Sequence, residues 1–287
     1  MIATPNVKIN LGLNVLRRRA DGYHDIETVF LPYDGIHDTL EIVAGDDYSR
    51  TSAGIFEKYG SASENGSCAP VVQAVSADGK LMITIARAAG VDWDALKDLT
   101  AKAYLLLSED FDLPPVKIFL EKTSPVGAGL GGGSSDAASA LRMLDSLAGL
   151  GLSENVLAGY AARLGSDVPF FIYNRPMYGE GRGEVLSDIS IDFSDRYEVR
   201  VVVPENISVS TAEAYGGIVP RVPEQGIKDI LRLPVESWKG LLVNDFEETV
   251  FARHPELASI KNSLYESGAV YASMSGSGSS LFGIYLK

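Results

Sequence analysis

The chain has 287 residues, 46% hydrophobic and 22% charged, a composition that excludes collagen-like, coiled-coil and wholly disordered proteins. Its 25 basic and 38 acidic residues give a net charge of −13, which argues against nucleic acid or an anionic membrane as a partner but is compatible with a local basic pocket for a small anion. Cys68 is the single cysteine, and no stretch approaches about 18 uninterrupted apolar residues, so we expect a soluble cytoplasmic protein.

The first predicted element is a β-strand over residues 7–15, where apolar and polar residues alternate. This alternation places Lys8 and Asn10 side by side on the polar face of the strand. Residues 45–68 show little periodicity and predict no element. The other apolar runs before the middle of the chain predict strands at 26–31 and 39–43, a hairpin over 71–86, a helix over 95–108 and a strand at 116–120.

A glycine-rich segment follows, in which five of the eight residues from Val126 to Gly133 are glycine. Glycine adopts positive φ and lets an anion approach backbone N–H groups, so these glycines before a helix predict a phosphate-binding loop; the alternative is a flexible turn. The segment is not a P-loop, because Ser134 stands where that motif has lysine. Its G-x-G-x-x-G match also lacks the following strand that a dinucleotide-binding fold requires.

The rest of the chain mixes helices and strands without strict alternation. A helix is expected after the glycines, with Ser134 or Ser135 near its N-cap, and Asp167 lies where a short helix begins. The later predictions are a helix after Ser153, a strand at 198–203, helices near 211–216, 225–232 and 244–252, a helix from Pro255 and a strand at 280–286. This mixture predicts an α+β fold of two lobes, 1–180 and 181–287.

Three segments resemble the motifs of the GHMP small-molecule kinases, in the same order along the chain. They are 5–11, 125–135 and 274–280, so the resemblance covers nearly the whole chain. It implies a two-lobed architecture with the active site in the cleft between the lobes. Nucleotide and catalytic residues would belong to the first lobe, and the second lobe would lie on the substrate side.

Segments 19–24 and 164–170 are similar to one branch of that family, which acts on a cytidine diphosphate-linked polyol. The resemblance implies ATP-dependent phosphorylation of the 2-hydroxyl of a cytidine diphosphate-linked methylerythritol in non-mevalonate isoprenoid biosynthesis, with ATP and Mg²⁺ as cofactors. It implies that Lys8 and Asp167 form the catalytic pair. From the residues alone, Asp167 also fits a helix N-cap, and Lys8 an exposed lysine on an edge strand.

The resemblance implies further site residues on both substrates. On the nucleotide side they are Lys122, Pro125, Gly127, Gly129, Leu130, Gly131, Gly132, Gly133, Ser134 and Ser135. On the other side they are Asn10, Tyr23, His24, Thr211 and Tyr215, with the cytosine ring between the two tyrosines. Tyr215 also fits a core tyrosine, and Lys122 a solvated strand end. Asp136 and the two serines are candidates for contact with Mg²⁺, but no acidic pair has the spacing that would identify a metal site.

Two departures from the family pattern and two alternative functions stay open. The stretch 45–96 is longer than usual in the family, and the run 97–99 reads Lys-Asp-Leu where the family has Asp-Asn-Leu. One alternative keeps the kinase fold with mevalonate, homoserine or a sugar as acceptor. The other is a non-catalytic nucleotide-binding or scaffold protein, against which the retention of Lys8, Asp167 and the loop glycines argues.

Overall fold

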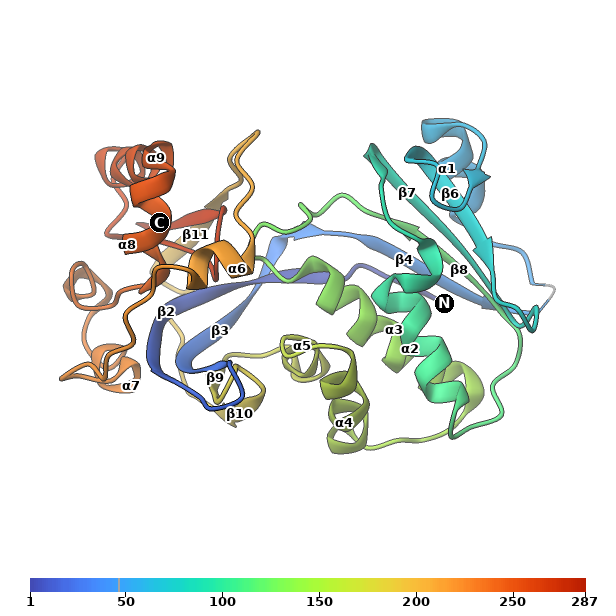
Figure 1. Cartoon of the computed structure of the whole chain (residues 1–287), viewed down its shortest axis with the longest axis horizontal. Helices are drawn as coiled ribbons and strands as arrows, with labels where there is room; N and C mark the ends of the chain where they lie inside the picture. Colours follow the sequence, from blue (N-terminus) through green and yellow to red (C-terminus); the bar gives the residue numbers. More distant parts are fainter. Residues whose placement is uncertain (46) are drawn as a thin grey trace. The chain divides into compact units, whose positions relative to one another are not determined.

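The computed structural model describes residues 1–45 and 47–287. Its chain forms two compact units, each built from several segments (Figure 1). Unit 1 consists of Met1–Val7, Asp34–Ser124 and Gly132–Asn174, and unit 2 of Lys8–Tyr33, Pro125–Gly131 and Arg175–Lys287. The two units are defined by contacts and combine segments that are far apart in sequence. The predicted lobes, 1–180 and 181–287, are continuous stretches assigned by function, and they stay a prediction.

Unit 1 is built on a six-stranded sheet flanked by helices. The strand order is β1 (Ile2–Ala3), β4 (Thr39–Ala44), β8 (Val116–Glu121), β7 (Leu81–Val91), β6 (Ala69–Val75) and β5 (Ser63–Glu64). The helices are α1 (Ser52–Tyr59), η1 (Ala95–Lys97), α2 (Leu99–Ser108), α3 (Gly132–Ala148), α4 (Glu154–Leu164) and α5 (Val168–Tyr173). Strand β4 pairs antiparallel with β8, and β7 pairs parallel with β8.

Both faces of this sheet are covered, which explains its continuous apolar strands. Helix α1 packs through Ile55 against Val43 and Phe119 on one face. The neighbouring residues Ile42 and Ile118 point to the opposite face and are fully buried. Helices α2 and α3 lie on that side in Figure 1. The glycine-rich segment therefore continues into a helix, α3, that is fixed against a sheet.

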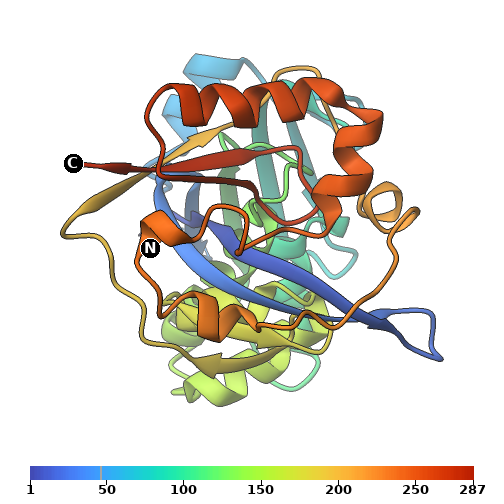
Figure 2. The same cartoon turned by 90° about the vertical axis from the view of Figure 1, so that its left-hand side faces the viewer.

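Unit 2 contains two smaller sheets. One has the order β10 (Val185–Asp188), β9 (Met177–Glu180), β3 (His24–His37) and β2 (Asn6–Arg18), and the other the order β11 (Tyr197–Val202), β13 (Leu281–Leu286) and β12 (Tyr271–Met274). The helices are α6 (Thr211–Tyr215), α7 (Ile227–Ile230), η2 (Val235–Ser237), α8 (Phe246–Arg253) and α9 (Pro255–Glu266). Figure 2 shows α9 lying along the three-stranded sheet. Leu257 and Leu264 of α9 join Met274 and Leu281 in the core.

Most predicted elements are confirmed, and the errors have physical causes. The helix predicted over 95–108 is split, because Asp98 ends η1 and caps α2 with its side chain. Helix α1 was missed, since only Ile55 is buried in it and its sequence shows no apolar stripe. Ser134 and Ser135 are not near an N-cap, because α3 already begins at Gly132. The short strands β1, β5, β9, β10 and β12 were also missed.

Strand β2 is the most informative correction. The sequence predicts one apolar and one polar face, yet Lys8, Asn10 and Asn14 are as buried as the apolar residues between them. Lys8 is only 3% exposed, so the reading of Lys8 as an exposed edge-strand lysine is wrong. A polar row buried along a strand needs partners, because an unpaired buried polar group costs about 1–3 kcal/mol.

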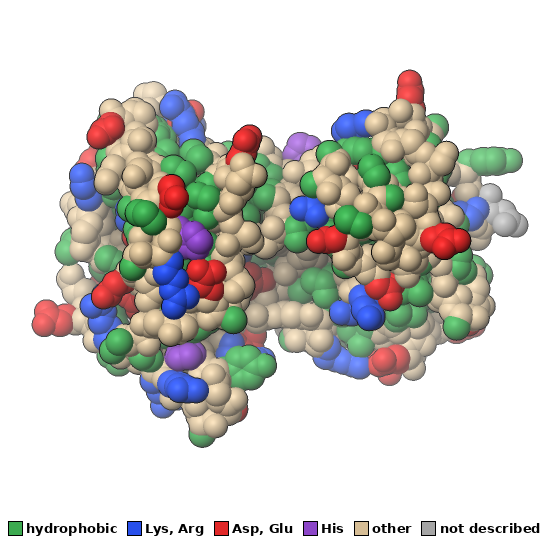
Figure 3. Space-filling model, turned by 45° about the horizontal axis from the view of Figure 1, so that its top comes forward, with side chains coloured by type: hydrophobic (Ala, Val, Ile, Leu, Met, Phe, Trp, Pro, Cys, Tyr) green, Lys and Arg blue, Asp and Glu red, His purple; other side chains and the backbone are tan. Residues whose placement is uncertain are grey.

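On the face drawn in Figure 3, acidic and basic side chains are interspersed over each unit, and no broad basic field is visible. This distribution agrees with the net charge of −13. Of the helices that the structure describes, none is long and apolar enough to cross a membrane.

Candidate active site

In unit 2, Lys8 lies where three separate chain segments meet. Its ammonium donates hydrogen bonds to Asn10 Oδ1 at 2.6 Å and to the carbonyl of Gly129 at 2.8 Å. Its backbone N–H donates to the carbonyl of Leu130 at 2.9 Å. The first of the three sequence motifs is thereby joined to the glycine-rich segment by both the side chain and the main chain of one residue.

The third motif reaches the same point. Ser275 Oγ donates to the carbonyl of Gly129 at 3.0 Å. A Cβ on Gly129 would lie 2.1 Å from the Ser275 carbonyl, and one on Gly276 would lie 3.3 Å from the Lys8 ammonium. Glycine is required at position 129 for space as well as for its φ of +77°. The structure therefore brings all three motif segments together around the Lys8 ammonium.

Asn244 holds the main chain of the third motif through hydrogen bonds, and the sequence analysis missed it. Its side-chain amide donates to the carbonyls of Met274 at 2.8 Å and Gly276 at 2.9 Å. Its Oδ1 accepts from the N–H of Phe246, at the start of α8. The sequence predicts only a helix cap for an asparagine at this position. The contacts of Asn244 with the third motif become visible only in the folded chain.

A group of aromatic side chains in unit 2 contains the residues predicted for the cytosine ring. The rings of His24 and Tyr215 are stacked, with centroids 4.8 Å apart and planes at 20°. Tyr215 also meets Phe246 edge-on at 4.7 Å and packs on the core, so its reading as a core residue stays open. Tyr23 is 55% exposed, and the Arg182 guanidinium lies 4.8 Å from its ring centroid. Burial lowers the pKa of His24, as does the charge of the neighbouring Arg18.

In unit 1, Asp167 stands at the N-cap position of α5, as the sequence predicts. Its side chain makes no capping hydrogen bond to the described residues of that helix, so capping does not account for an aspartate there. Pro169 lies in the first turn, and residues 168–172 are buried, so the position of Asp167 is fixed by a packed helix. Thr211, by contrast, is an exposed residue at the start of α6 in unit 2.

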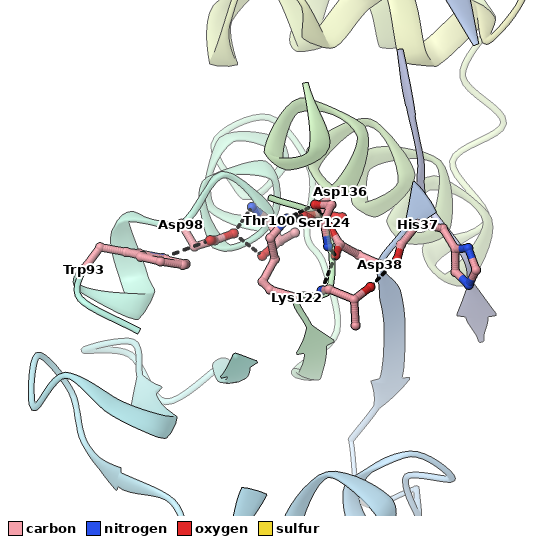
Figure 4. Close-up of polar contacts among 9 residues, drawn as sticks. His37, Asp38, Trp93, Asp98, Thr100, Lys122, Ser124 and Asp136 are labelled. Atoms are coloured by element: carbon pink, nitrogen blue, oxygen red, sulfur yellow. Dashed lines mark hydrogen bonds and ion pairs between the residues drawn. The ribbon is translucent and has the colours of Figure 1, made fainter. Parts of the chain in front are cut away.

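The second buried lysine of the prediction, Lys122, lies in unit 1 between two carboxylates (Figure 4). Its ammonium is 2.5 Å from Asp38 Oδ2 and 2.5 Å from Asp136 Oδ2, and all three side chains are buried. Ser124 Oγ donates to Asp38 Oδ2 at 2.6 Å. We call Lys122, Asp38, Asp136 and Ser124 the Lys122 cluster. The alternative of a solvated lysine at a strand end is wrong, and Asp136 is too enclosed to contact Mg²⁺ in this structure.

Burial and the neighbouring charges act in opposite directions on the pKa values of the Lys122 cluster. Burial raises the pKa of Asp136 well above its ordinary range. Burial alone would also raise the pKa of Asp38, but the Lys122 ammonium and the donors of Ser124 outweigh it and lower that pKa. Burial opposes the charge of Lys122, and the two carboxylates outweigh burial and raise its pKa. Burial thus favours the protonated form of Asp136, whereas Lys122 and Ser124 favour the ionised form of Asp38.

Asp98 occupies the position where the family pattern has asparagine, and in this structure it has a local role. Its carboxylate accepts from the N–H and hydroxyl of Thr100 at 2.9 and 2.7 Å and from the indole of Trp93 at 3.1 Å. Figure 4 shows these contacts beside the Lys122 cluster. Asp98 thereby caps α2.

No group of three or more His, Cys, Asp or Glu side chains could hold a metal ion among residues 1–45 and 47–287. The described residues therefore offer no all-protein metal cage. The described residues fit an anion site better. Three glycines of the segment 125–131 have φ near +70°, and α3 begins directly after this segment.

Comparison with known proteins assigns this geometry to a family. The family model of the GHMP kinases N terminal domain matches residues 98–175, and that of the GHMP kinases C terminal matches residues 227–287. A crystal structure of 4-(cytidine 5'-diphospho)-2C-methyl-D-erythritol kinase is similar with a TM-score of 0.72 at 29% identity, covering 99% of this chain and 89% of that one. A crystal structure of mevalonate kinase, with a TM-score of 0.59 at 14% identity and coverage of 100% and 91%, shares the fold.

Relatives that match over the full length identify the branch of the GHMP kinases to which the chain belongs. The 4-diphosphocytidyl-2-C-methyl-D-erythritol kinase of Azobacteroides pseudotrichonymphae genomovar. CFP2 is 44% identical over 100% of this chain and 94% of that protein. That of Parabacteroides distasonis is 42% identical, over 100% and 92%. The predicted α+β fold of the GHMP kinases and the predicted small-molecule kinase class are confirmed. The chain belongs to the family of the 4-diphosphocytidyl-2-C-methyl-D-erythritol kinases, among the GHMP kinases.

Proposed function

We propose that this kinase transfers the γ-phosphoryl group of ATP to the 2-hydroxyl of 4-diphosphocytidyl-2-C-methyl-D-erythritol, giving the 2-phosphate and ADP. This reaction belongs to non-mevalonate isoprenoid precursor biosynthesis, and we place it in the cytoplasm. The observation that carries the proposal is the meeting of the three motif segments at the Lys8 ammonium in unit 2. The full-length identity of 44% to a relative of that name supports the choice of substrate.

Lys8 and Asp167 are the proposed catalytic residues. Transfer of a phosphoryl group to an alcohol depends mainly on positioning and charge stabilisation, together with a group that orients or accepts the hydroxyl proton. The ammonium of Lys8, fixed by Asn10 and Gly129, would stabilise negative charge on the transferred group. The carboxylate of Asp167 would receive or orient the proton of the acceptor hydroxyl.

The glycine-rich segment is the proposed site for the phosphates of ATP. The residues assigned to it are Pro125, Gly127, Gly129, Leu130, Gly131, Gly132, Gly133, Ser134 and Ser135. Gly127 is exposed and has open space around its Cα, so a ligand can approach its main chain. The first N–H groups of α3 add donors and the positive end of the helix dipole.

Mg²⁺ would enter this reaction as part of the MgATP substrate. Mg²⁺ in phosphoryl-transfer enzymes keeps several waters and is held by phosphates together with one or two carboxylates. The lack of a three-acid cluster in the described chain fits this mode of binding better than a permanent metal site.

The cytosine end of the substrate is assigned to Tyr23, His24 and Tyr215, with Asn10 and Thr211 as further contacts. The exposed ring of Tyr23 offers a stacking surface, and base stacking on an aromatic ring contributes about 1–3 kcal/mol. His24 stacks on one face of Tyr215, so a base that stacks on that face must displace the imidazole.

The release of ADP with different acceptors tests this proposal. We expect ADP formation with the cytidine substrate, competition by CDP, and no competition by mevalonate. Turnover of mevalonate, homoserine or a sugar instead would support another GHMP kinase. Nucleotide binding with no turnover of any of these acceptors would support the non-catalytic alternative.

A further inference from the structure

We infer that the Lys122 cluster is a positioning device that holds the two ends of the glycine-rich segment together and thereby sets the affinity for the nucleotide. This inference rests on the proposed role of that segment as the phosphate site. It gives Lys122 a role through the protein main chain rather than through direct contact with the nucleotide.

The first end of the segment is fixed by Asp38, which precedes β4. Asp38 Oδ1 accepts from the N–H groups of Thr123 and Ser124 at 2.6 and 2.7 Å. Its Oδ2 accepts from Ser124 Oγ and from the Lys122 ammonium. All three residues that lead into Pro125 are therefore bonded to one buried carboxylate.

The second end is fixed by Asp136, in the first turns of α3. Its Oδ2 accepts from the Lys122 ammonium at 2.5 Å, so one ammonium joins the strand before the segment to the helix after it. The two ends also touch, because a Cβ on Gly132 would lie 2.2 Å from Ser124 Oγ. Seven residues, 125–131, span the gap between these fixed points.

Burial explains why the Lys122 cluster positions the ends of the segment and does not bind the nucleotide itself. The Lys122 side chain is 3% exposed and those of Asp38 and Asp136 are 0% and 1% exposed, so a nucleotide has no access to these groups. Asp136 Oδ1 has no hydrogen-bond partner within the described part of the chain. A buried group that is only partly satisfied costs stability, which points to a requirement for the geometry that it imposes.

The segment itself cannot supply that geometry. Gly127, Gly129 and Gly131 have φ of +71°, +77° and +72°, and glycine loses more conformational freedom on ordering than any other residue. Groups in an active site that are misplaced by about 1 Å can cost about 10²-fold in rate. The anchors at Ser124 and Gly132 therefore fix the two ends of the segment, while Lys8 and Ser275 hold its middle at Gly129.

Calorimetric titration with ADP tests the inference without use of the cytidine substrate. For Lys122→Met we expect the Kd for ADP to rise about tenfold or more at unchanged stoichiometry. Lys80→Met makes the same change at the exposed Lys80–Asp112 pair of unit 1 and serves as the matched control.

The titration gives a different result if the Lys122 cluster only stabilises the fold and does not affect the affinity for ADP. Lys122→Met would then bind ADP with the wild-type Kd at reduced stoichiometry, and this outcome overturns the inference. If Lys122→Met does not fold, Ser124→Ala decides, because it removes one donor to Asp38 and keeps the charges; a Kd raised by about threefold or more supports the inference, and an unchanged Kd overturns it. Wild type that binds ADP but does not phosphorylate the cytidine substrate refutes the proposed function alone.

Discussion

The structure contains two buried lysines of the predicted site, one in each unit, and their surroundings differ. The ammonium of Lys8, in unit 2, donates to an amide oxygen and to a main-chain carbonyl of the segment itself. The ammonium of Lys122, in unit 1, is held between the carboxylates of Asp38 and Asp136. Lys8 is therefore placed against the segment, whereas Lys122 is placed against the residues that flank it.

The difference shows how burial can serve two purposes. The Lys8 ammonium touches the main chain of the segment proposed to bind phosphate, a place where it can act on a ligand phosphate. A lysine between two carboxylates has its charge balanced inside the protein, and its removal leaves buried groups unpaired. We therefore expect replacement of Lys122 to affect stability first, and replacement of Lys8 to affect catalysis first.

The largest effect on stability is expected for Lys122→Met. It leaves the Asp38 carboxylate buried without its ammonium, and the loss of one partner of a buried pair costs about 3–5 kcal/mol. Urea unfolding of the variant measures this loss. Lys80→Met, at an exposed pair, should change the free energy of unfolding by no more than about 0.5 kcal/mol. Equal effects of the two substitutions would show that the Lys122 cluster does not stabilise the fold.

For Lys8→Met we expect kcat to fall by about 10²–10³-fold, since loss of one donor to the developing charge costs about 3–4 kcal/mol of transition-state stabilisation. Methionine keeps the length of the buried stem, so the free energy of unfolding should change less than in Lys122→Met. Steady-state release of ADP and urea unfolding give the two quantities. If Lys8→Met unfolds readily but keeps its kcat, the expectation that Lys8 serves catalysis rather than stability is wrong.

The glycine-rich segment allows a sharper test of how tightly it is packed within unit 2. Gly129→Ala places a Cβ 2.1 Å from the Ser275 carbonyl, so main chain must move. Gly127→Ala at a similar φ meets open space and should cost only the left-handed conformation, about 1–2 kcal/mol. We expect Gly129→Ala to lose more stability than Gly127→Ala in the same urea titration; equal losses would contradict the packing described.

The smallest change is expected for Asp136→Asn, and it should depend on pH. Burial raises the pKa of Asp136 above the ordinary value of 3.8, so the folded protein keeps a proton that the unfolded chain releases as pH rises. The unfolded state then binds fewer protons, and this group destabilises the fold increasingly above about pH 4. Asparagine has no such proton, so the stability of the variant relative to wild type should increase from pH 4 to pH 7. A constant difference over that range would show that Asp136 is ionised in the fold.

Much of the fold could be predicted from local pattern. The alternation of 7–15 identifies β2, and caps such as Ser153 identify the start of α4, because these signals act over a few residues. Short strands such as β1 and β9 could not be predicted, since they have two and four residues and pair with β4 and β3, which lie far away in sequence. Helix α1 is fixed by packing of Ile55 rather than by its own pattern.

The candidate site was predicted in part, for similar reasons. The sequence motifs identify Lys8 and the glycine-rich segment, and the structure brings these two together. Asn244 and Asp38 were missed because these partners lie 30 or more residues away in sequence. The burial of Lys122 follows from two carboxylates that meet it only in the folded chain.

The central claim is that this chain is a kinase in which Lys8 and Asp167 perform the transfer. The most direct measurement is the release of ADP from ATP and the cytidine substrate by Asp167→Asn, together with calorimetric binding of ADP to the same protein. We predict that kcat falls by about 10²-fold or more while the Kd for ADP stays near the wild-type value. Turnover close to that of wild type would contradict the account.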